Sequence, residues 1–160
     1  MKPYQLVKKS AGILMFRREP ALEFLLVHPG GPFWKNKDQH AWSIPKGELS
    51  EDEDPLQAAI REFKEETGFD IQGDFLVLPA IKQKSGKWIY AWAVEANLDE
   101  TAISGNLFSL EWPPRSGKVL EFPEVDRAGW FNVEEAKEKL NEAQYGLIGS
   151  LIELLKIQPG

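Results

Sequence analysis

Apolar runs separated by short turns predict two pairs of β-strands in this chain. Ala11–Arg18 and Leu22–His28 are rich in Ile, Leu, Val and Phe, and the segment Glu19-Pro20-Ala21 between them favours a turn. We therefore expect a hairpin. Asp74–Ile81 and Lys87–Leu98 have the same character and flank Ser85-Gly86, which predicts a second strand pair.

The segments between these pairs are more polar. Pro29–His40 is rich in Gly, Pro and Lys and predicts a loop, whereas Ala41–Ile44 predicts a short strand that leads into a Pro45-Lys46-Gly47 turn. Ser104–Pro123 contains Trp112-Pro113-Pro114, which argues against regular structure there. We expect that stretch to be irregular.

A helix is predicted after Asp54. Asp54 is a favourable N-cap, Pro55 suits the first helical position and Gly68 suits the C-terminal cap. Five residues recur at helical spacing and predict the face turned to the core: Leu56, Ala59, Ile60, Phe63 and Thr67.

Two further helices are expected near the C-terminus. Trp130-Phe131 leads into the first, where Asn132 and Glu135 have the spacing of a capping box, and Leu147–Ile157 forms the second after Gly146. Strands and helices mixed in this way predict an α/β sandwich with a mixed sheet between helices. A length of 160 residues suits one domain over 1–160.

Charge and composition narrow the classes of partner. The net charge of −6 makes a long nucleic acid an unfavourable partner, although a small polyanion can be held by a metal and a few lysines. The absence of Cys excludes disulfides and thiolate metal sites and suits a cytoplasmic location. The longest early apolar run, Ala11–Phe16, is too short for a membrane span or signal segment.

Acidic residues cluster on the helix after Asp54. Glu62, Glu65 and Glu66 are three and four residues apart, so their carboxylates share one face and repel each other. A compensating cation is therefore expected. Oxygen ligands on a rigid element suit a hard divalent ion, Mg²⁺ above all, that holds substrate phosphates.

The stretch Gly47–Phe69 resembles the Nudix box of the MutT-like pyrophosphohydrolases. It matches the fixed Gly, Glu and Arg positions of that box, and Phe63 and Phe69 stand where the family usually carries an aliphatic residue. This departure concerns packing rather than chemistry. The resemblance implies the Nudix fold, an α/β/α sandwich.

The resemblance also implies residue roles. It assigns metal binding to Glu62, Glu65 and Glu66, with the backbone carbonyl near Lys46-Gly47 completing the shell. Mn²⁺ is a possible substitute for Mg²⁺. Glu62 and Glu66 both remain candidates for the general base. Arg61 and Glu53 are expected to orient the loop and helix through a salt bridge.

Relatives often supply another acid from a downstream loop. Pro123–Phe131 is similar to the corresponding stretch of RNA 5′-pyrophosphohydrolases, which indicates Glu124 as a metal ligand and Glu121 as the fallback.

Substrate-binding candidates lie outside the box. Lysines are candidates for phosphate binding, a tyrosine could add a hydroxyl, and two aromatic residues in a loop could stack a nucleobase; these are Lys46, Lys82, Lys84, Tyr90, Phe33 and Trp34. We expect Lys82 and Lys84 to share one face of a strand. His28 and His40 have no partner spacing typical of a zinc site and are interpreted as loop or edge residues.

Trp42–Gly47 resembles the Trp-x-x-Pro-Lys-Gly motif that leads into the box in diadenosine polyphosphate hydrolases and some MutT-like triphosphatases. The resemblance therefore implies a Mg²⁺-dependent hydrolase of a nucleoside diphosphate-linked substrate, with a dinucleoside polyphosphate first. Nucleoside triphosphates, modified ones included, come second and RNA 5′ ends third. A non-catalytic, nucleotide-sensing module is the rival, although such a module would be expected to lose box acids. The oligomeric state, monomer or homodimer, stays open.

Overall fold

The computed structural model describes residues 8–157. Its strands are β1 (Lys9–Arg17), β2 (Glu23–Pro29), β3 (Lys46–Glu48), β4 (Leu76–Lys82), β5 (Trp88–Glu95), β6 (Leu107–Glu111), β7 (Val119–Pro123) and β8 (Val125–Asn132). Its helices are α1 (Pro55–Thr67), α2 (Val133–Lys139) and α3 (Tyr145–Ile157), with 3₁₀ turns η1 (Glu100–Ala102) and η2 (Glu142–Gln144). No helix in this range is both long and apolar enough to cross a membrane.

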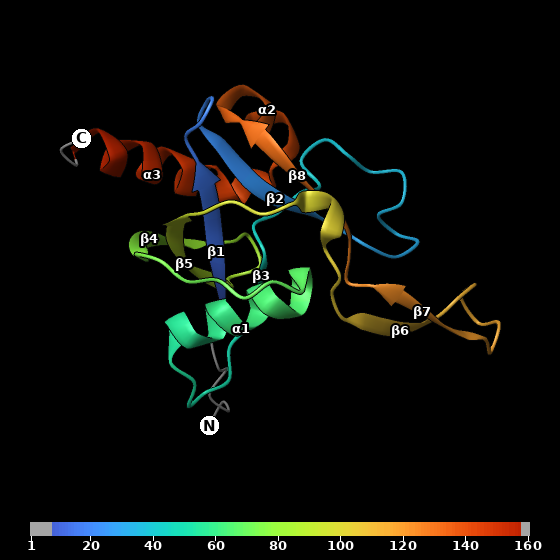
Figure 1. Ribbon diagram of the computed structural model, residues 1–160. Coiled ribbons are helices and arrows are strands. Elements are labelled where there is room, and N and C mark those ends of the chain that lie inside the picture. The colour runs from blue at the N-terminus through green and yellow to red at the C-terminus, as the bar shows by residue number, and fades with distance from the viewer. Residues whose placement is uncertain (1–7, 158–160) are drawn as a thin grey trace.

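The main sheet is mixed and has the order β4-β5-β1-β2-β8, with β3 also paired to β1. β1 runs parallel to β5 and antiparallel to β2 and β3. Figure 1 shows α1 on one side of this sheet and α2 and α3 on the other. The expected α/β/α sandwich with a mixed sheet is therefore confirmed, whereas one domain over residues 1–160 stays a prediction.

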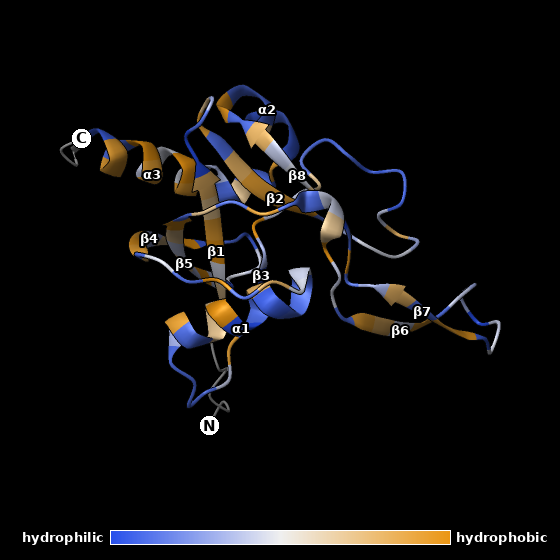
Figure 2. Cartoon of the chain, in the orientation of Figure 1, coloured by the Kyte–Doolittle hydropathy of each residue, from blue (hydrophilic) through white to orange (hydrophobic). Residues whose placement is uncertain are grey.

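The central strand β1 serves two cores. Ile13 and Met15 pack in the cluster that includes Phe63 of α1, whereas the alternate residues Leu14 and Phe16 pack in the cluster that includes α2 and α3. Because both faces are covered, β1 and β2 are nearly continuous hydrophobic runs (Figure 2).

The prediction of irregular structure over Ser104–Pro123 is wrong. β6 and β7 form an antiparallel ribbon with Glu111 opposite Val119, and the Pro113-Pro114 pair lies in the turn between them. Proline therefore ends the strands here without preventing them. In Figure 1 the ribbon extends away from the sandwich.

Three smaller expectations also need correction. The predicted strand Ala41–Ile44 makes only isolated bridges at Trp42 and Ser43, and the strand β3 lies where a turn was expected. The last helix begins at Tyr145 and contains Gly146. β8 was not predicted as a strand, because Asp126, Arg127 and Gly129 interrupt its apolar pattern.

Candidate active site

The helix α1 begins and ends where the sequence predicts. The Asp54 side chain accepts a hydrogen bond from the Gln57 amide at 3.0 Å, and Pro55 opens the helix. Gly68 adopts a left-handed conformation with φ of 82° and donates its amide hydrogen to the Lys64 carbonyl at 2.7 Å. Phe63 and Thr67 are buried, as expected, so the acidic residues face the other way.

Gly47 lets β3 lie directly against this helix. A Cβ atom at Gly47 would stand 2.0 Å from Oε2 of Glu62, far inside van der Waals contact. The Glu62 carboxylate therefore occupies the space that any larger residue would fill. This close approach explains why the chain needs glycine at the start of the box.

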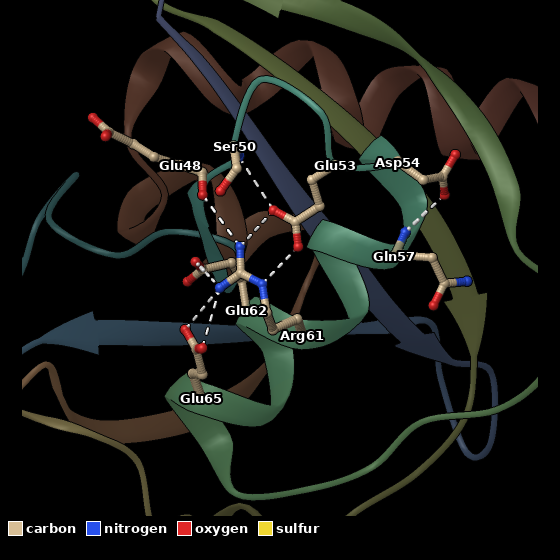
Figure 3. A network of polar contacts seen from close by, with 8 residues as sticks. All are labelled: Glu48, Ser50, Glu53, Asp54, Gln57, Arg61, Glu62 and Glu65. Carbon is tan, nitrogen blue, oxygen red and sulfur yellow. Dashed lines mark hydrogen bonds and ion pairs between the residues drawn. The ribbon is translucent and has the colours of Figure 1, made fainter.

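Arg61 holds the acids of the box in one network (Figure 3). Its Nε and Nη2 donate to the two carboxylate oxygens of Glu53 at 2.7 and 2.9 Å. Its Nη1 donates to Glu62 at 2.8 Å and to Glu65 at 3.1 Å. The hydrogen bonds that Arg61 donates to Glu53, and then to Glu62 and Glu65, raise the pKa of Arg61. The expected Arg61–Glu53 salt bridge is present, and it includes two more acids than the sequence indicated.

Glu66 is the most deeply placed acid of the cluster. Its Oε2 accepts a hydrogen bond from the Lys46 amide at 3.1 Å. Burial, and to a smaller extent the nearby Glu62 and Glu124, raise the pKa of Glu66 to about 8. Burial also lowers the pKa of Lys46. A neighbouring cation would keep Glu66 ionised at neutral pH.

Glu124 lies at the one-residue junction between β7 and β8. Its amide donates to the Asn106 carbonyl at 2.9 Å, and the Asn106 amide donates to the Glu65 carbonyl at 2.8 Å. Two backbone bonds thus attach Glu124 to the C-terminal end of α1. Burial, followed by repulsion from Glu65, raises the pKa of Glu124. Glu121 instead lies on β7, and both of these acidic residues are largely exposed.

These elements enclose a hollow of about 230 Å³. It brings together Trp34, Lys46, Glu66 and Glu124. The rest of its lining comes from strand ends and from the segments before β3 and α3: Val27, Pro29, Ala41, Trp42, Ser43, Ile44, Gln83, Val125, Asn141 and Gln144.

Other predicted substrate residues lie outside this hollow. Lys82 and Lys84 line a neighbouring hollow that shares Gln83 and Asn141 with the first, and Lys84 lies in the turn after β4 rather than on a strand. Phe33 is 59% exposed and packs edge-on against Trp112. Tyr90 lies on β5 with Nζ of Lys9 above its ring.

Gln144 is a lining residue that sequence reasoning missed. It is buried, accepts a hydrogen bond from the Ile44 amide at 3.0 Å, and donates to the Ser43 hydroxyl at 3.0 Å. The partners are about a hundred residues apart in the chain. No local pattern could have indicated this contact.

The interpretation of His28 as a loop or edge residue is wrong. His28 lies on β2, an interior strand, and its side chain is fully buried. The run Leu25-Leu26-Val27 before it was the signal that this position continues a buried strand. His40 does lie in a loop, with its Nδ1 2.8 Å from the Tyr145 hydroxyl.

The donor set fits a hard divalent ion. Every predicted ligand offers oxygen, and Glu66 offers a buried carboxylate with one backbone donor. Within residues 8–157, no three acidic or histidine side chains are already arranged as a set of ligands. Arg61 explains this arrangement, because it draws Glu62 and Glu65 toward itself.

The mixed sheet between helices and the acidic helix α1 define an α/β/α sandwich with carboxylates beside a hollow. Residues 7–150 match the NUDIX domain family, so the chain belongs to the Nudix family.

The chain is similar to several characterised proteins. It is 34% identical over 105 residues to the mRNA-decapping protein g5R of African swine fever virus, a match covering 60% of this chain and 39% of that protein. It is 42% identical over 62 residues to the asymmetrical bis(5′-nucleosyl)-tetraphosphatase of Caenorhabditis elegans, covering 38% of this chain and 41% of that protein. The matches thus span about two fifths of the length of these relatives.

The structure also resembles a binary complex of the C. elegans Ap4A hydrolase, with a TM-score of 0.66 and 24% identity. That likeness covers 94% of this chain and 98% of the other. It supports the sandwich fold.

Proposed function

We propose that this chain is a Mg²⁺-dependent pyrophosphohydrolase that cleaves a phosphoanhydride bond in a dinucleoside polyphosphate. The observation that carries the proposal is the placement of the box acids against β3: the Glu62 carboxylate fills the space beside Gly47, and Glu66 accepts a hydrogen bond from the Lys46 amide. Carboxylates brought together in this way favour the binding of a divalent cation. The name of the C. elegans relative supports the choice of substrate.

In this proposal the acids of α1 and the β7–β8 junction hold the ion. Glu62, Glu65, Glu66 and Glu124 supply carboxylate oxygens, and the carbonyl near Gly47 supplies another. Once bound, the ion neutralises the phosphates and lowers the pKa of an attacking water. Mn²⁺ is expected to replace Mg²⁺, because both accept oxygen ligands.

The chain's own residues then orient and activate the reactants. Lys46 lines the hollow together with Glu66, and its ammonium can pair there with a phosphate. The attacking water delivers its proton to Glu62 or Glu66, the two candidate bases. Arg61 stays paired with Glu53 and orients the helix, while Glu62 and Glu65 would exchange its guanidinium for the ion.

The nucleoside part of the substrate is assigned to the other side of the hollow. Trp34 lines it and is 38% exposed, so one face of the indole is available for stacking. Phe33 adjoins it, and Lys82 and Lys84 border the neighbouring hollow, where phosphates farther along the substrate would lie. Tyr90 has no contact in the structure that supports its predicted role.

A hydrolysis screen tests the proposal. Dinucleoside polyphosphates, nucleoside triphosphates and 5′-triphosphorylated RNA should be compared with Mg²⁺, with Mn²⁺ and with chelator, and the products identified by mass. We expect the highest kcat/KM for a dinucleoside polyphosphate and none with chelator. A higher kcat/KM for triphosphates or RNA would replace the substrate, and binding of nucleotides without hydrolysis would favour a sensing module.

A further inference from the structure

A buried histidine connects two segments that border the hollow, the loop after β2 and the start of β8. His28 lies on β2 with its side chain fully buried, and its Nε2 is 2.6 Å from the carbonyl oxygen of Lys37. Its Nδ1 is 2.9 Å from Oδ1 of Asp126 on β8. The first partner belongs to the loop after β2, and the second lies two residues after Glu124.

Both bonds have a defined direction. A backbone carbonyl can only accept, so Nε2 donates to Lys37, and a carboxylate likewise accepts from Nδ1. The Trp42 ring packs edge-on against the His28 ring, with 5.2 Å between their centres. The Arg127 guanidinium lies over the Trp42 ring, 5.2 Å from its centre. The histidine is therefore held by aromatic packing as well as by its two hydrogen bonds.

The bond to Lys37 reaches Trp34 in two steps. The Lys37 amide donates to the Trp34 carbonyl at 3.0 Å, and the Lys37 ammonium lies 5.1 Å from the centre of the indole ring. The Trp34 amide in turn donates to the Gly31 carbonyl at 3.3 Å. Fixing the carbonyl of Lys37 thus fixes the turn that presents Trp34 to the hollow.

We propose that His28 is a positioning residue for nucleotide binding: its bond to the Lys37 carbonyl holds Trp34 in place to stack a nucleobase. This inference rests on the proposed function, since Trp34 is the residue assigned to the nucleoside. Its ligand is a nucleotide whose base stacks on the indole. His28 itself does not border the hollow.

Two amide substitutions separate the two bonds of His28. The side-chain amide nitrogen of glutamine can reach the place of Nε2, and that of asparagine the place of Nδ1. His28→Gln therefore retains a donor toward Lys37 and loses the one toward Asp126. His28→Asn does the reverse, so the two variants are matched in chemistry and opposite in the bond they keep.

For the nucleotide that the wild-type protein hydrolyses best, we expect His28→Asn to raise KM about 2- to 10-fold, the size of one hydrogen bond. Its kcat should stay within about threefold, because stacking acts on ground and transition states alike. His28→Gln should leave KM within about twofold. A purely structural role would lower Tm in both variants and give them the same KM, which overturns the proposal.

Hydrogen exchange supplies a readout that does not need activity. Amides of residues 31–37 should exchange faster in His28→Asn than in His28→Gln and the wild-type protein. If no nucleotide is hydrolysed but this difference appears, the proposed function fails while the anchoring of the loop stands. Equal exchange in both variants overturns the anchoring itself.

A double-mutant cycle tests whether His28 acts through Trp34. In the Trp34→Ala background, His28→Asn should change KM by less than about twofold, because residues acting as a unit are not additive. A full additional effect overturns the proposed route. Leu151→Ala, a truncation of a fully buried side chain of α3, serves as a control that lowers Tm without changing KM.

Discussion

The two sides of the hollow are held in place by different kinds of contact. The inner side consists of β3 and α1, and the side-chain bonds that join β3 and Glu53 to α1 connect residues at most twenty positions apart, such as Lys46 with Glu66 and Glu53 with Arg61. The outer side consists of the loop after β2 and the β7–β8 junction, where His28 bonds to Asp126, 98 residues away. Apart from Glu124, the chemistry is assigned to the locally built side, and recognition of the nucleoside is assigned to the side built from distant segments.

This difference has a physical reason. A helix with both ends capped keeps its carboxylates at fixed spacing, which a metal site requires. A loop fixed by a few separate bonds can change its shape without disturbing that helix. Substitutions on the inner side should therefore affect turnover, and those in the loop after β2 should affect affinity.

The largest effect is expected for Glu66→Gln. The amide keeps the shape of the side chain but removes the ligand charge, so kcat should fall by orders of magnitude while Tm stays near the wild-type value. Steady-state kinetics with Mg²⁺ and a melting curve measure both. Glu51→Gln, at an exposed position before the helix, is the control and should leave both kcat and Tm unchanged.

The same substitution at the other acids gives a ranking of the expected losses of turnover. Glu62→Gln should be about as damaging as Glu66→Gln, whereas Glu124→Gln should be milder, because water can replace a ligand supplied from a strand junction. If Glu124→Gln proves the most severe of the three, the general base lies on the outer side and the comparison is reversed.

Gly47→Ala should give the next largest effect. The new methyl group would overlap the Glu62 carboxylate and displace it, so we expect kcat to fall about 10- to 100-fold, as for small misplacements of reacting groups. Gly149→Ala is a matched control in α3, where nothing lies within 4 Å of the added carbon. Wild-type turnover in Gly47→Ala would contradict the steric argument.

Trp34→Ala should act on affinity. Loss of one stacked base should raise KM roughly 5- to 100-fold and change kcat little. Tm should hardly move, because the indole is 38% exposed. Trp130→Ala, at a tryptophan that packs under Arg17 away from the hollow, should lower Tm and leave KM unchanged. A normal KM with a depressed Tm in Trp34→Ala would make that residue structural instead.

The smallest effect concerns the pH dependence of stability in chelator. Burial raises the pKa of Glu66 from its ordinary value of 4.5 to about 8, so the folded state retains a proton that the unfolded chain releases. This contribution to stability is complete below pH 4.5 and is lost as the pH rises through about 8.

We therefore expect Tm to decrease by a few degrees between pH 5 and pH 8.5 in chelator. Mg²⁺ should raise Tm more at the higher pH, because a smaller fraction of Glu66 then carries a proton that the ion must displace. Glu66→Gln should show a flatter profile. A Tm that rises across this range in the wild-type protein would contradict the burial of an uncompensated acid.

The same division explains what the sequence could and could not predict. The caps of α1, the Arg61–Glu53 pair and the capping box at Asn132 follow from residues a few positions apart. The burial of His28, the ribbon of β6 and β7, and the contact of Gln144 with Ile44 depend on segments brought together only by folding. The Pro113-Pro114 pair marks only a turn, and the prediction wrongly extended its effect to the whole of Ser104–Pro123.

The backbone bond between Glu124 and Asn106 has a consequence for protein engineering. It joins the two ends of the β6–β7 ribbon, since Asn106 precedes β6 and Glu124 follows β7. Glu124 is thereby placed by the base of the ribbon and not by its length. The exposed turn at Pro113–Gly117 is accordingly a grafting point, where an inserted peptide or a fluorescent label would leave the acidic cluster undisturbed.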